Sequence, residues 1–344
     1  MGFLPTIKDV AQAAEVHFTT VSMALRGDPR VRPETRKRIL AAALRTGYQR
    51  NPVSNALSLR RRTARAAAII PRIAYLANRS PENGFYSRDY ISNLLQGAKE
   101  KALTLGYEFE VLFVDKGHHD SRSLHHYLKT HAIHGFIIGA FEPDRSGLKL
   151  KWDDFCIVQI DSRHFQPSFN FVSHDQMHAV RLAFQNLRRL GYRRVGLAVG
   201  AIDEIVTANL PGCGYLLETS SVRVDDRVKP LLFPPDVSMS AAAKIAADWI
   251  KKEAVDAVIC NWTYIPRLLR MGRVPSHVAC ACMCLQEGIP NVAGVVSNTE
   301  LVGSQLTSML AALLQSESYG IPSIPTSTYV EGFWHDGPSA PPRD

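Results

Sequence analysis

The first residues of the chain that could do chemistry are the polar side chains within residues 6–25, TIKDVAQAAEVHFTTVSMAL. Their Thr, Ser and Lys side chains can form hydrogen bonds with base edges and phosphate oxygens. Apolar residues recur at helical spacing in two short runs, which predicts two helices joined by a tight turn. Such a pair is suited to laying its second helix in the major groove of DNA.

The first predicted helix begins with a capping signal, because Thr6 stands three residues before Asp9. Its apolar face comprises Ile7, Val10, Ala11 and Ala14. The second helix turns Val16, Val21 and Leu25 inward. The residues expected to face outward from it are Phe18, Thr19, Ser22, Met23 and Arg26.

Positive charge is concentrated in this part of the chain. Residues 1–65 contain 13 Lys and Arg residues against four acids, a net charge of +9, whereas the whole chain of 344 residues carries +8. A basic module on a near-neutral body is the expected signature of phosphate binding. A solvated basic helix face would explain the charge alone, but not its coincidence with a helix-turn-helix pattern.

A third helix and a short fourth one are predicted next. Pro33 and Gly47 mark the ends of the third helix. Its expected apolar face is Ile39, Leu40, Ala43 and Leu44. Asn51-Pro52 then opens a helix over Val53–Leu59, which residues 60–62 (Arg-Arg-Arg) close. Because this segment is short and polar, we expect it to become ordered only on DNA.

The motifs of residues 1–65 resemble the LacI/GalR (lactose-repressor/galactose-repressor) family of bacterial transcription regulators. They are T-I-K-D-V-A at 6–11, T-V-S at 20–22, E-T-R-K-R-I at 34–39, G-Y at 47–48 and N-P-V-S-N-A-L at 51–57. Weaker motifs further along the chain extend the resemblance, and they occur in the same order as in the family. They are L-G-Y at 105–107, H-G-F-I-I at 134–138, V-S-H-D at 172–175 and L-G-Y-R-R-V-G-L at 190–197.

The resemblance implies roles for individual residues. Residues facing base edges would be Phe18, Thr19 and Met23, with Ser22 in support. Leu57 would insert into the minor groove and kink the duplex. The full set of implied DNA-binding residues is Lys8, Phe18, Thr19, Thr20, Ser22, Met23, Arg26, Arg30, Arg32, Thr35, Asn51 and Leu57.

Three residues depart from the family's usual pattern in this segment. Glu15 stands where a turn glycine is usual, so it is strained if its φ is positive. His17 replaces the small hydroxyl residue that usually caps the second helix. Met23 stands where a basic residue is often found, so a strong guanine contact is missing.

From residue 72 onward, strands and helices alternate, which predicts parallel sheets with helices on both faces. The fold class is therefore an α-helical helix-turn-helix head with a hinge helix, joined to an α/β two-lobed body like the periplasmic binding proteins. The predicted domains are a head over 1–50, a hinge over 51–71, a body over 72–334 and a flexible tail over 335–344. The resemblance places three chain crossings between lobe one (72–192 and 294–318) and lobe two (193–293 and 319–334).

Ligands of open α/β sheets bind at the carboxyl ends of strands. The predicted effector-binding residues are Phe85, Tyr86, Asp161, Asp175, Asn209 and Trp262. Trp262 either stacks on a sugar ring or fills the space between lobes, and Phe85 and Tyr86 either contact the ligand or pack in the core. Asp161 and Asp175 either bind the ligand or cap helices. The family's usual Arg and two carboxylates are missing, so the expected effector is a neutral carbohydrate or its aromatic conjugate.

Other chemistry has little support. The histidines around residues 118–131 show no ordered set of metal ligands, and alternating Cys280, Cys282 and Cys284 are best explained as buried small residues. No nucleophile–base motif, phosphate loop or dinucleotide fingerprint occurs, so we expect neither an enzyme nor a cofactor.

The sequence thus predicts a DNA-binding transcription regulator, expected to be a repressor, which acts as a homodimer on a pseudo-palindromic operator and is controlled by a small-molecule effector. No signal pattern or membrane span is recognised, so we expect a cytoplasmic, nucleoid-associated protein. Two alternatives remain: a sugar-binding receptor with an accessory basic head, and a family member that has lost effector control.

Overall fold

The computed structural model describes residues 5–25, 30–48, 70–78, 88–114, 121–139, 141, 148–161, 163–288 and 291–343. The chain divides into two compact units, Met1–Ile70 and Pro71–Asp344, which we call the head and the body. The predicted hinge helix, with Asn51 and Leu57, lies outside the described residues, as do Arg26, Phe85 and Tyr86.

The head contains the three predicted helices, α1 (Ile7–Ala13), α2 (Phe18–Leu25) and α3 (Pro33–Thr46). The predicted cap of α1 is present, because the amide and the hydroxyl of Thr6 donate to the Asp9 carboxylate at 2.6 and 2.7 Å. Pro33 is the first residue of α3, and Gly47 ends it with φ of +67°. Local sequence signals therefore set the ends of these helices.

The head core differs from the expected one on α3. Leu40 and Leu44 are 45% and 84% exposed, and Ala42 is buried beside Ile39 and Ala43 instead. The core of the head consists of Val10, Ala11, Ala14, Val21, Ala24, Val31, Ile39, Ala42 and Ala43. Small residues at the contact let three short helices approach closely, which turns the larger leucines outward.

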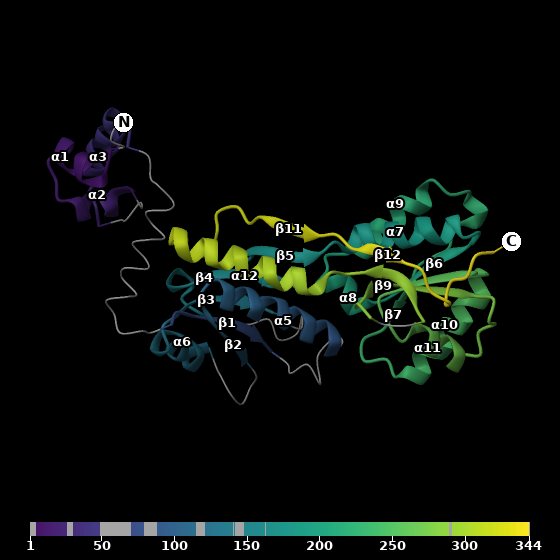
Figure 1. The fold of residues 1–344 in the computed structure, drawn as a ribbon. Helices are drawn as coiled ribbons and strands as arrows, with labels where there is room; N and C mark the ends of the chain where they lie inside the picture. The colour runs from purple at the N-terminus through teal and green to yellow at the C-terminus, as the bar shows by residue number, and fades with distance from the viewer. Residues whose placement is uncertain are drawn as a thin grey trace. The chain divides into compact units, whose positions relative to one another are not determined.

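The body has two sheets, one in each lobe (Figure 1). Lobe one has strand order β11-β5-β4-β3-β1-β2, and all neighbours are parallel. Its strands are β1 (Arg72–Ala77), β2 (Glu108–Phe113), β3 (Ile133–Ile138), β4 (Cys156–Ile160), β5 (Asn170–His174) and β11 (Ser327–Val330).

Lobe two has strand order β12-β10-β9-β8-β6-β7, in which only the β12–β10 pair is antiparallel among the described strands. Its strands are β6 (Val195–Gly200), β7 (Leu231–Phe233), β8 (Ala257–Cys260), β9 (Ala279–Leu285), β10 (Ala293–Val296) and β12 (Phe333–His335). The predicted parallel sheets are confirmed in both lobes.

Helices cover both faces of each sheet. In lobe one, α5 (Arg88–Thr104) and α12 (Thr299–Ser316) share a core with Ile73 and Tyr75. The opposite face, with Ala74 and Leu76, packs on α6 (Ser121–Thr130) and on residues next to the short helix η2 (Trp152–Asp154). Period-two alternation along buried strands supplies both faces with apolar side chains.

Lobe two repeats this layering. On one face, Ala257 and Ile259 pack with α7 (Gln176–Arg189) and α9 (Leu210–Ser220). On the other face, Val258 and Cys260 pack with α10 (Met239–Glu253) and α11 (Ile265–Met271). The remaining short helices of this lobe are α8 (Ala201–Val206) and η3 (Val224–Asp226).

The contact between α5 and α12 depends on two glycines that the sequence analysis did not single out. A Cβ on Gly97 would lie 1.9 Å from the Glu300 carbonyl oxygen, and one on Gly303 would lie 2.0 Å from that of Leu94. Any side chain at either position would force the helices apart, so these glycines set the spacing of the pair.

The lobe boundaries differ from the expected ones, although the chain does cross three times. Helix α7 packs in lobe two, β10 belongs to the sheet of lobe two and β11 to that of lobe one. The crossings therefore follow β5, β10 and β11, near residues 175, 297 and 331. An apolar stripe predicts a buried face but not the sheet that covers it.

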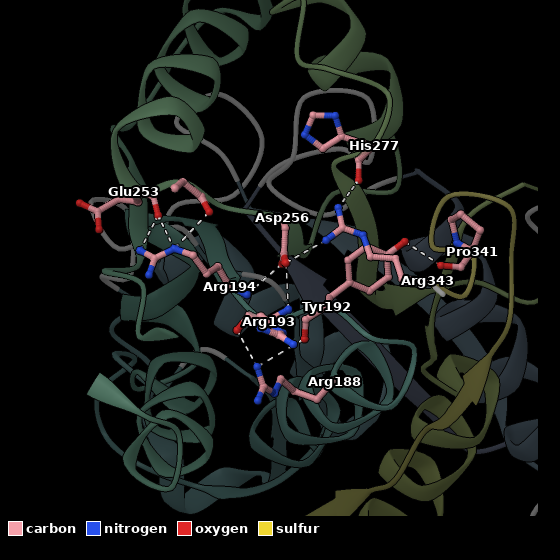
Figure 2. A network of polar contacts seen from close by, with 10 residues as sticks. Arg188, Tyr192, Arg193, Arg194, Glu253, Asp256, His277, Pro341 and Arg343 are labelled. Atoms are coloured by element: carbon pink, nitrogen blue, oxygen red, sulfur yellow. Dashed lines mark hydrogen bonds and ion pairs between the residues drawn. The ribbon is translucent and has the colours of Figure 1, made fainter. Parts of the chain in front are cut away.

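The expectation of a flexible tail is also wrong for the described residues up to 343. Ala340 is 3% exposed, and Ser339 bonds to Cys280 and Ala293 on two strands. Figure 2 shows Arg343 held beside Asp256, with its guanidinium donating to the His277 carbonyl oxygen at 2.9 Å. The proline-rich composition predicted disorder, but backbone and side-chain bonds dock this segment on lobe two.

Candidate functional site

Helix α2 presents part of its predicted outer face to solvent. Phe18 is 44% exposed and Thr19 is exposed, while Thr20 and Ser22 are half-buried. Buried Val21 and Ala24 hold the opposite face in the core of the head. The exposed face begins in the first turn, where a recognition helix contacts base edges.

Met23 lies differently from the other predicted base-reading residues. It is half-buried and packs against the core of the head. Part of its side chain therefore stabilises the head, and any contact with a base would use what remains accessible.

The turn before α2 confirms the predicted conformation of Glu15 and shows how His17 acts. Glu15 has φ of +50°, a conformation that is strained for a residue with a side chain. His17 caps α2, since its Nδ1 accepts from the Thr19 amide at 3.4 Å and lies 2.8 Å from the Thr19 hydroxyl. The ring thus replaces the usual hydroxyl cap with a longer bond.

Basic side chains flank this helix. Lys8, Arg30 and Arg32 are exposed, and Thr35 is half-buried in the first turn of α3. Arg45 ties α3 to α1 by donating to the Ala13 carbonyl oxygen at 3.3 Å, so it has a structural role that the sequence did not indicate. The contacts of these residues with phosphate stay predictions.

In the body, Asp161 lies where the sequence predicts a ligand-binding carboxylate. It follows β4 with φ of +44° and is 2% exposed. Its carboxylate accepts a short hydrogen bond from the Ser173 hydroxyl and another at 3.4 Å from the Tyr90 hydroxyl of α5. It does not cap a helix in these contacts, unlike Asp175, whose side chain accepts from the amide of His178 in α7 at 2.8 Å.

A second buried carboxylate, which sequence reasoning missed, lies at the carboxyl end of β6. Asp203 in α8 is 7% exposed and accepts from Asn261 Nδ2 at 2.6 Å and from the Gly200 amide at 3.0 Å. Burial raises the pKa of Asp203 to about 6, against the lowering effect of these two donors. The available signal was an acidic residue directly after a buried strand, on the edge where ligands bind.

These two carboxylates, one from each lobe, lie near the same thiol. Burial, together with the charges of Asp161 and Asp203, raises the pKa of Cys284 to about 11, against the lowering effect of a hydrogen bond with Ser297. Cys284 is near the end of β9 and also packs against the core of lobe one. The carboxyl ends of β4, β6 and β9 therefore meet at one interlobe junction.

Among the described residues, two hydrogen bonds join the lobes at this junction. Asn93 Nδ2 on α5 donates to Gln286 Oε1 after β9 at 3.1 Å. The Arg163 amide, after β4, donates to the Val206 carbonyl oxygen in α8 at 3.1 Å. Each bond has one partner in each lobe, so both stabilise the angle between the lobes in this arrangement.

The aromatic side chains of lobe two support the packing interpretation of Trp262. Trp262 is half-buried and stacks on Phe233 at 4.5 Å and on Tyr264 at 5.4 Å between ring centroids. Tyr264, which the sequence analysis missed, is 40% exposed. Asn209 is exposed at the start of α9, with φ of +60° and no side-chain capping bond.

The remaining candidates give no further site. Among the described residues, no three His, Cys, Asp or Glu side chains are grouped to hold a metal ion. Cys280 and Cys282 are buried as expected, whereas Cys284 is half-buried. Within the same residues, no helix is long and apolar enough to cross a membrane.

Comparison with known proteins identifies both units. Residues 6–51 match the family described as "Bacterial regulatory proteins, lacI family". Residues 80–210 match the "Periplasmic binding proteins and sugar binding domain of LacI family". The first match covers the helices of the head, and the second covers the body from α5 to α8.

Individual relatives agree with this assignment. An uncharacterized HTH-type transcriptional regulator in the aml 5′ region of Streptomyces limosus is 26% identical over 261 residues, which are 70% of this chain and 67% of that protein. The structure of the transcriptional regulator CelR in complex with cellobiose superposes with a TM-score of 0.59 at 19% identity, covering 97% of this chain and 99% of CelR. The lac repressor dimer bound to operator and the anti-inducer ONPF gives 0.56 at 17% identity, covering 98% and 100%. With a matching head, a matching body and the same order of elements, the chain belongs to the LacI family of bacterial regulatory proteins.

Proposed function

We propose that this protein is a transcription regulator that binds a specific DNA sequence through α2 and is controlled by a carbohydrate-related effector. The observation that carries the proposal is the α1–α2 pair, whose second helix keeps Phe18 and Thr19 exposed while Val21 and Ala24 anchor it. Basic side chains flank this helix, as phosphate contacts require. Such a protein acts in the cytoplasm, on the chromosome.

The effector binds at the interlobe junction. Asp161 and Asp203 accept hydrogen bonds from sugar hydroxyls, and Tyr264 offers an accessible ring for the apolar face of a sugar. The family description of the body as a sugar-binding domain and the cellobiose complex of CelR support a carbohydrate. The two buried carboxylates replace the family's usual Arg and acidic residues with a different set of acceptors.

Control of DNA binding requires that the effector distinguish two arrangements of the lobes. The Asn93–Gln286 and Arg163–Val206 bonds stabilise the arrangement described here. An effector that fits between Asp161 and Asp203 changes the balance between this arrangement and a more open one. Either direction of control, repression or activation, is compatible with this coupling.

The protein acts as a homodimer, because one recognition helix reads only a few base pairs. Lobe one offers an apolar surface for self-association at the end of α5 and on the edge strand β2. Leu103, Leu105 and Phe113 there are 77%, 38% and 37% exposed. Leu103→Glu should yield monomers by light scattering, whereas Leu216→Glu on the surface of lobe two should leave the dimer intact.

Selection from a random duplex pool with the full chain tests the DNA-binding proposal. We expect a pseudo-palindromic sequence. Thr19→Ala should weaken its binding about tenfold, because one base-edge hydrogen bond is lost. Gln12→Ala, at an exposed position of α1, is the matched control and should bind like the wild type. Binding that depends on salt but not on sequence would instead favour a sugar receptor with a basic accessory head.

The minor-groove role of Leu57 is tested separately. Leu57→Ala should lose DNA bending and about 2 kcal/mol of operator affinity, because an unstacked base step is no longer filled. If the variant bends and binds the operator like the parent, the hinge assignment is wrong.

The effector proposal is tested by the response of operator binding to sugars. Asp161→Asn and Tyr264→Ala should abolish that response and leave operator affinity intact. Asp248→Asn, on the exposed face of α10, should keep it. A response that survives both changes contradicts the site, and a wild type that responds to no carbohydrate favours a regulator that has lost effector control.

A further inference from the structure

Lobe one carries a hollow away from the interlobe junction, and the described side chains that line it are all basic. Its volume is about 570 Å³. The lining residues of this basic hollow are Arg122, His125, His126, Lys129, Lys149 and Lys151. Four come from α6 (Figure 1) and two from the segment before η2.

The local structure explains why these side chains gather. Leu124 and Leu128 of α6 are buried in the core of lobe one, so the basic residues at neighbouring positions occupy the outer face of the helix. Beside it, Leu148 and Leu150 are buried, and the alternating Lys149 and Lys151 are exposed. An amphipathic helix and an extended segment thus present their charged sides to the same space.

One carboxylate pairs with three of these basic side chains. Lys129, Lys151 and His125 all share one carboxylate, that of Asp154, at 3.6, 4.0 and 3.4 Å. The described lining contains four Lys and Arg side chains and no acidic one. Gathering like charges opposes folding through mutual repulsion, and a bound anion relieves that repulsion.

The position of the hollow separates it from the effector site. Lys129 and Lys151 come shortly before β3 and β4, whereas Asp161 follows the carboxyl end of β4. A ligand in the hollow would contact lobe one alone, so it would not compete directly with an effector held between the two lobes.

We propose that the basic hollow binds a small anion with at least two phosphate groups, such as the diphosphate part of a metabolite. Its volume lies within the range of small-molecule sites, roughly 300–1,000 Å³. Lys ammonium groups and an Arg guanidinium provide charge-assisted donors for several phosphate oxygens at once. A single phosphate would engage fewer of these donors, so the diphosphate binds more tightly.

Calorimetry on the full chain with inorganic pyrophosphate, at fixed ionic strength, tests the proposal. Lys129→Gln/Lys149→Gln should weaken pyrophosphate binding at least tenfold. Lys244→Gln/Lys252→Gln is the matched control, because it makes the same charge change at exposed positions of α10 and should not alter the affinity. The basic head is present in every variant, so its contribution cancels.

Acylation of lysines, read by mass spectrometry, locates the bound anion. Pyrophosphate should protect Lys129, Lys149 and Lys151, and orthophosphate should do so less. Equal affinity in the two double variants, protection confined to the head, or equal binding of sulfate at the same ionic strength would each overturn the proposal. Protection by duplex DNA but not by pyrophosphate would overturn it in favour of a DNA-contacting surface.

Discussion

Single buried side chains decide the chemistry of the interlobe junction. Asp203 has a pKa of about 6 because burial disfavours its charged form, although Asn261 and the Gly200 amide stabilise the carboxylate. Its pKa lies above the ordinary value of 3.8, so the folded protein holds a proton in a pH range where the unfolded chain has released it. The contribution of Asp203 to stability therefore falls as pH rises through this range.

Asp203→Asn removes this pH dependence while keeping the shape of the side chain. The free energy of unfolding of the variant, relative to wild type, should increase by about 1 kcal/mol between about pH 5 and about pH 8. Urea unfolding at several pH values measures the difference. The opposing effect of His174, whose pKa burial lowers to about 4, is present in both proteins and cancels. A flat difference profile would show that Asp203 is not desolvated in solution.

The turn residue Glu15 is strained by its positive φ. Glu15→Gly should raise the free energy of unfolding of the head by up to about 1 kcal/mol, since relief of strain outweighs the entropy that glycine adds to the unfolded chain. Hydrogen exchange of amides in α1, α2 and α3 of the full chain reports this quantity. Gln12→Gly, within α1, should lower it by a similar amount, and equal effects of the two changes would contradict the argument.

At the scale of elements, the segment after β12 completes lobe two. The Arg343 guanidinium bonds to Asp256 at 3.0 Å and lies 4.6 Å from the centroid of the Tyr192 ring, whose hydroxyl donates to the Pro341 carbonyl oxygen (Figure 2). Asp256 also accepts from the amides of Arg193 and Arg194, both at 2.9 Å. The segment thus connects the loop before β6 with the start of β8.

Arg343→Ala should destabilise lobe two by about 1–2 kcal/mol, because the ion pair, the bond to His277 and the ring contact are lost together. Denaturant unfolding followed by the fluorescence of Trp249 and Trp334, both in lobe two, measures this loss. Arg343→Lys keeps the positive charge but lacks the planar guanidinium, so its free energy of unfolding should lie between those of the alanine variant and the wild type. An unchanged transition in the alanine variant would mean that the docked segment adds nothing to the lobe.

At the scale of the whole body, the angle between the lobes depends on few bonds. Asn93→Ala removes the side-chain bond from α5 to Gln286 and should shift the balance toward open forms by about 1 kcal/mol, or roughly fivefold. Small-angle X-ray scattering should then give a larger radius of gyration. The control is Gln96→Ala on the same helix, whose amide bonds to Glu100 within lobe one. If both variants scatter alike, the Asn93 bond does not hold the lobes together.

Features that depend on neighbouring residues could be predicted from the sequence. The cap at Thr6 and Asp9 and the ends of α3 at Pro33 and Gly47 follow from interactions within a few residues, so local sequence predicts them. The alternation of strands and helices along the chain likewise predicted parallel sheets with helices on both faces.

Other features depended on contacts between residues far apart in the chain. Periodicity could not reveal that α3 buries Ala42 rather than Leu44, or that α7 packs in lobe two. Nor could it reveal that Ser339 bonds to Cys280 in β9 and Arg343 to Asp256 before β8. Periodicity also could not show that Asp161 and Asp203 both lie near the Cys284 thiol. The sequence by itself determined the family, the helices of the head and the layered body, because local propensity and the spacing of apolar residues are properties of short segments. Only the tertiary structure decided which elements share a lobe and which carboxylates share a site, because burial and charge at a position depend on every segment that packs around it.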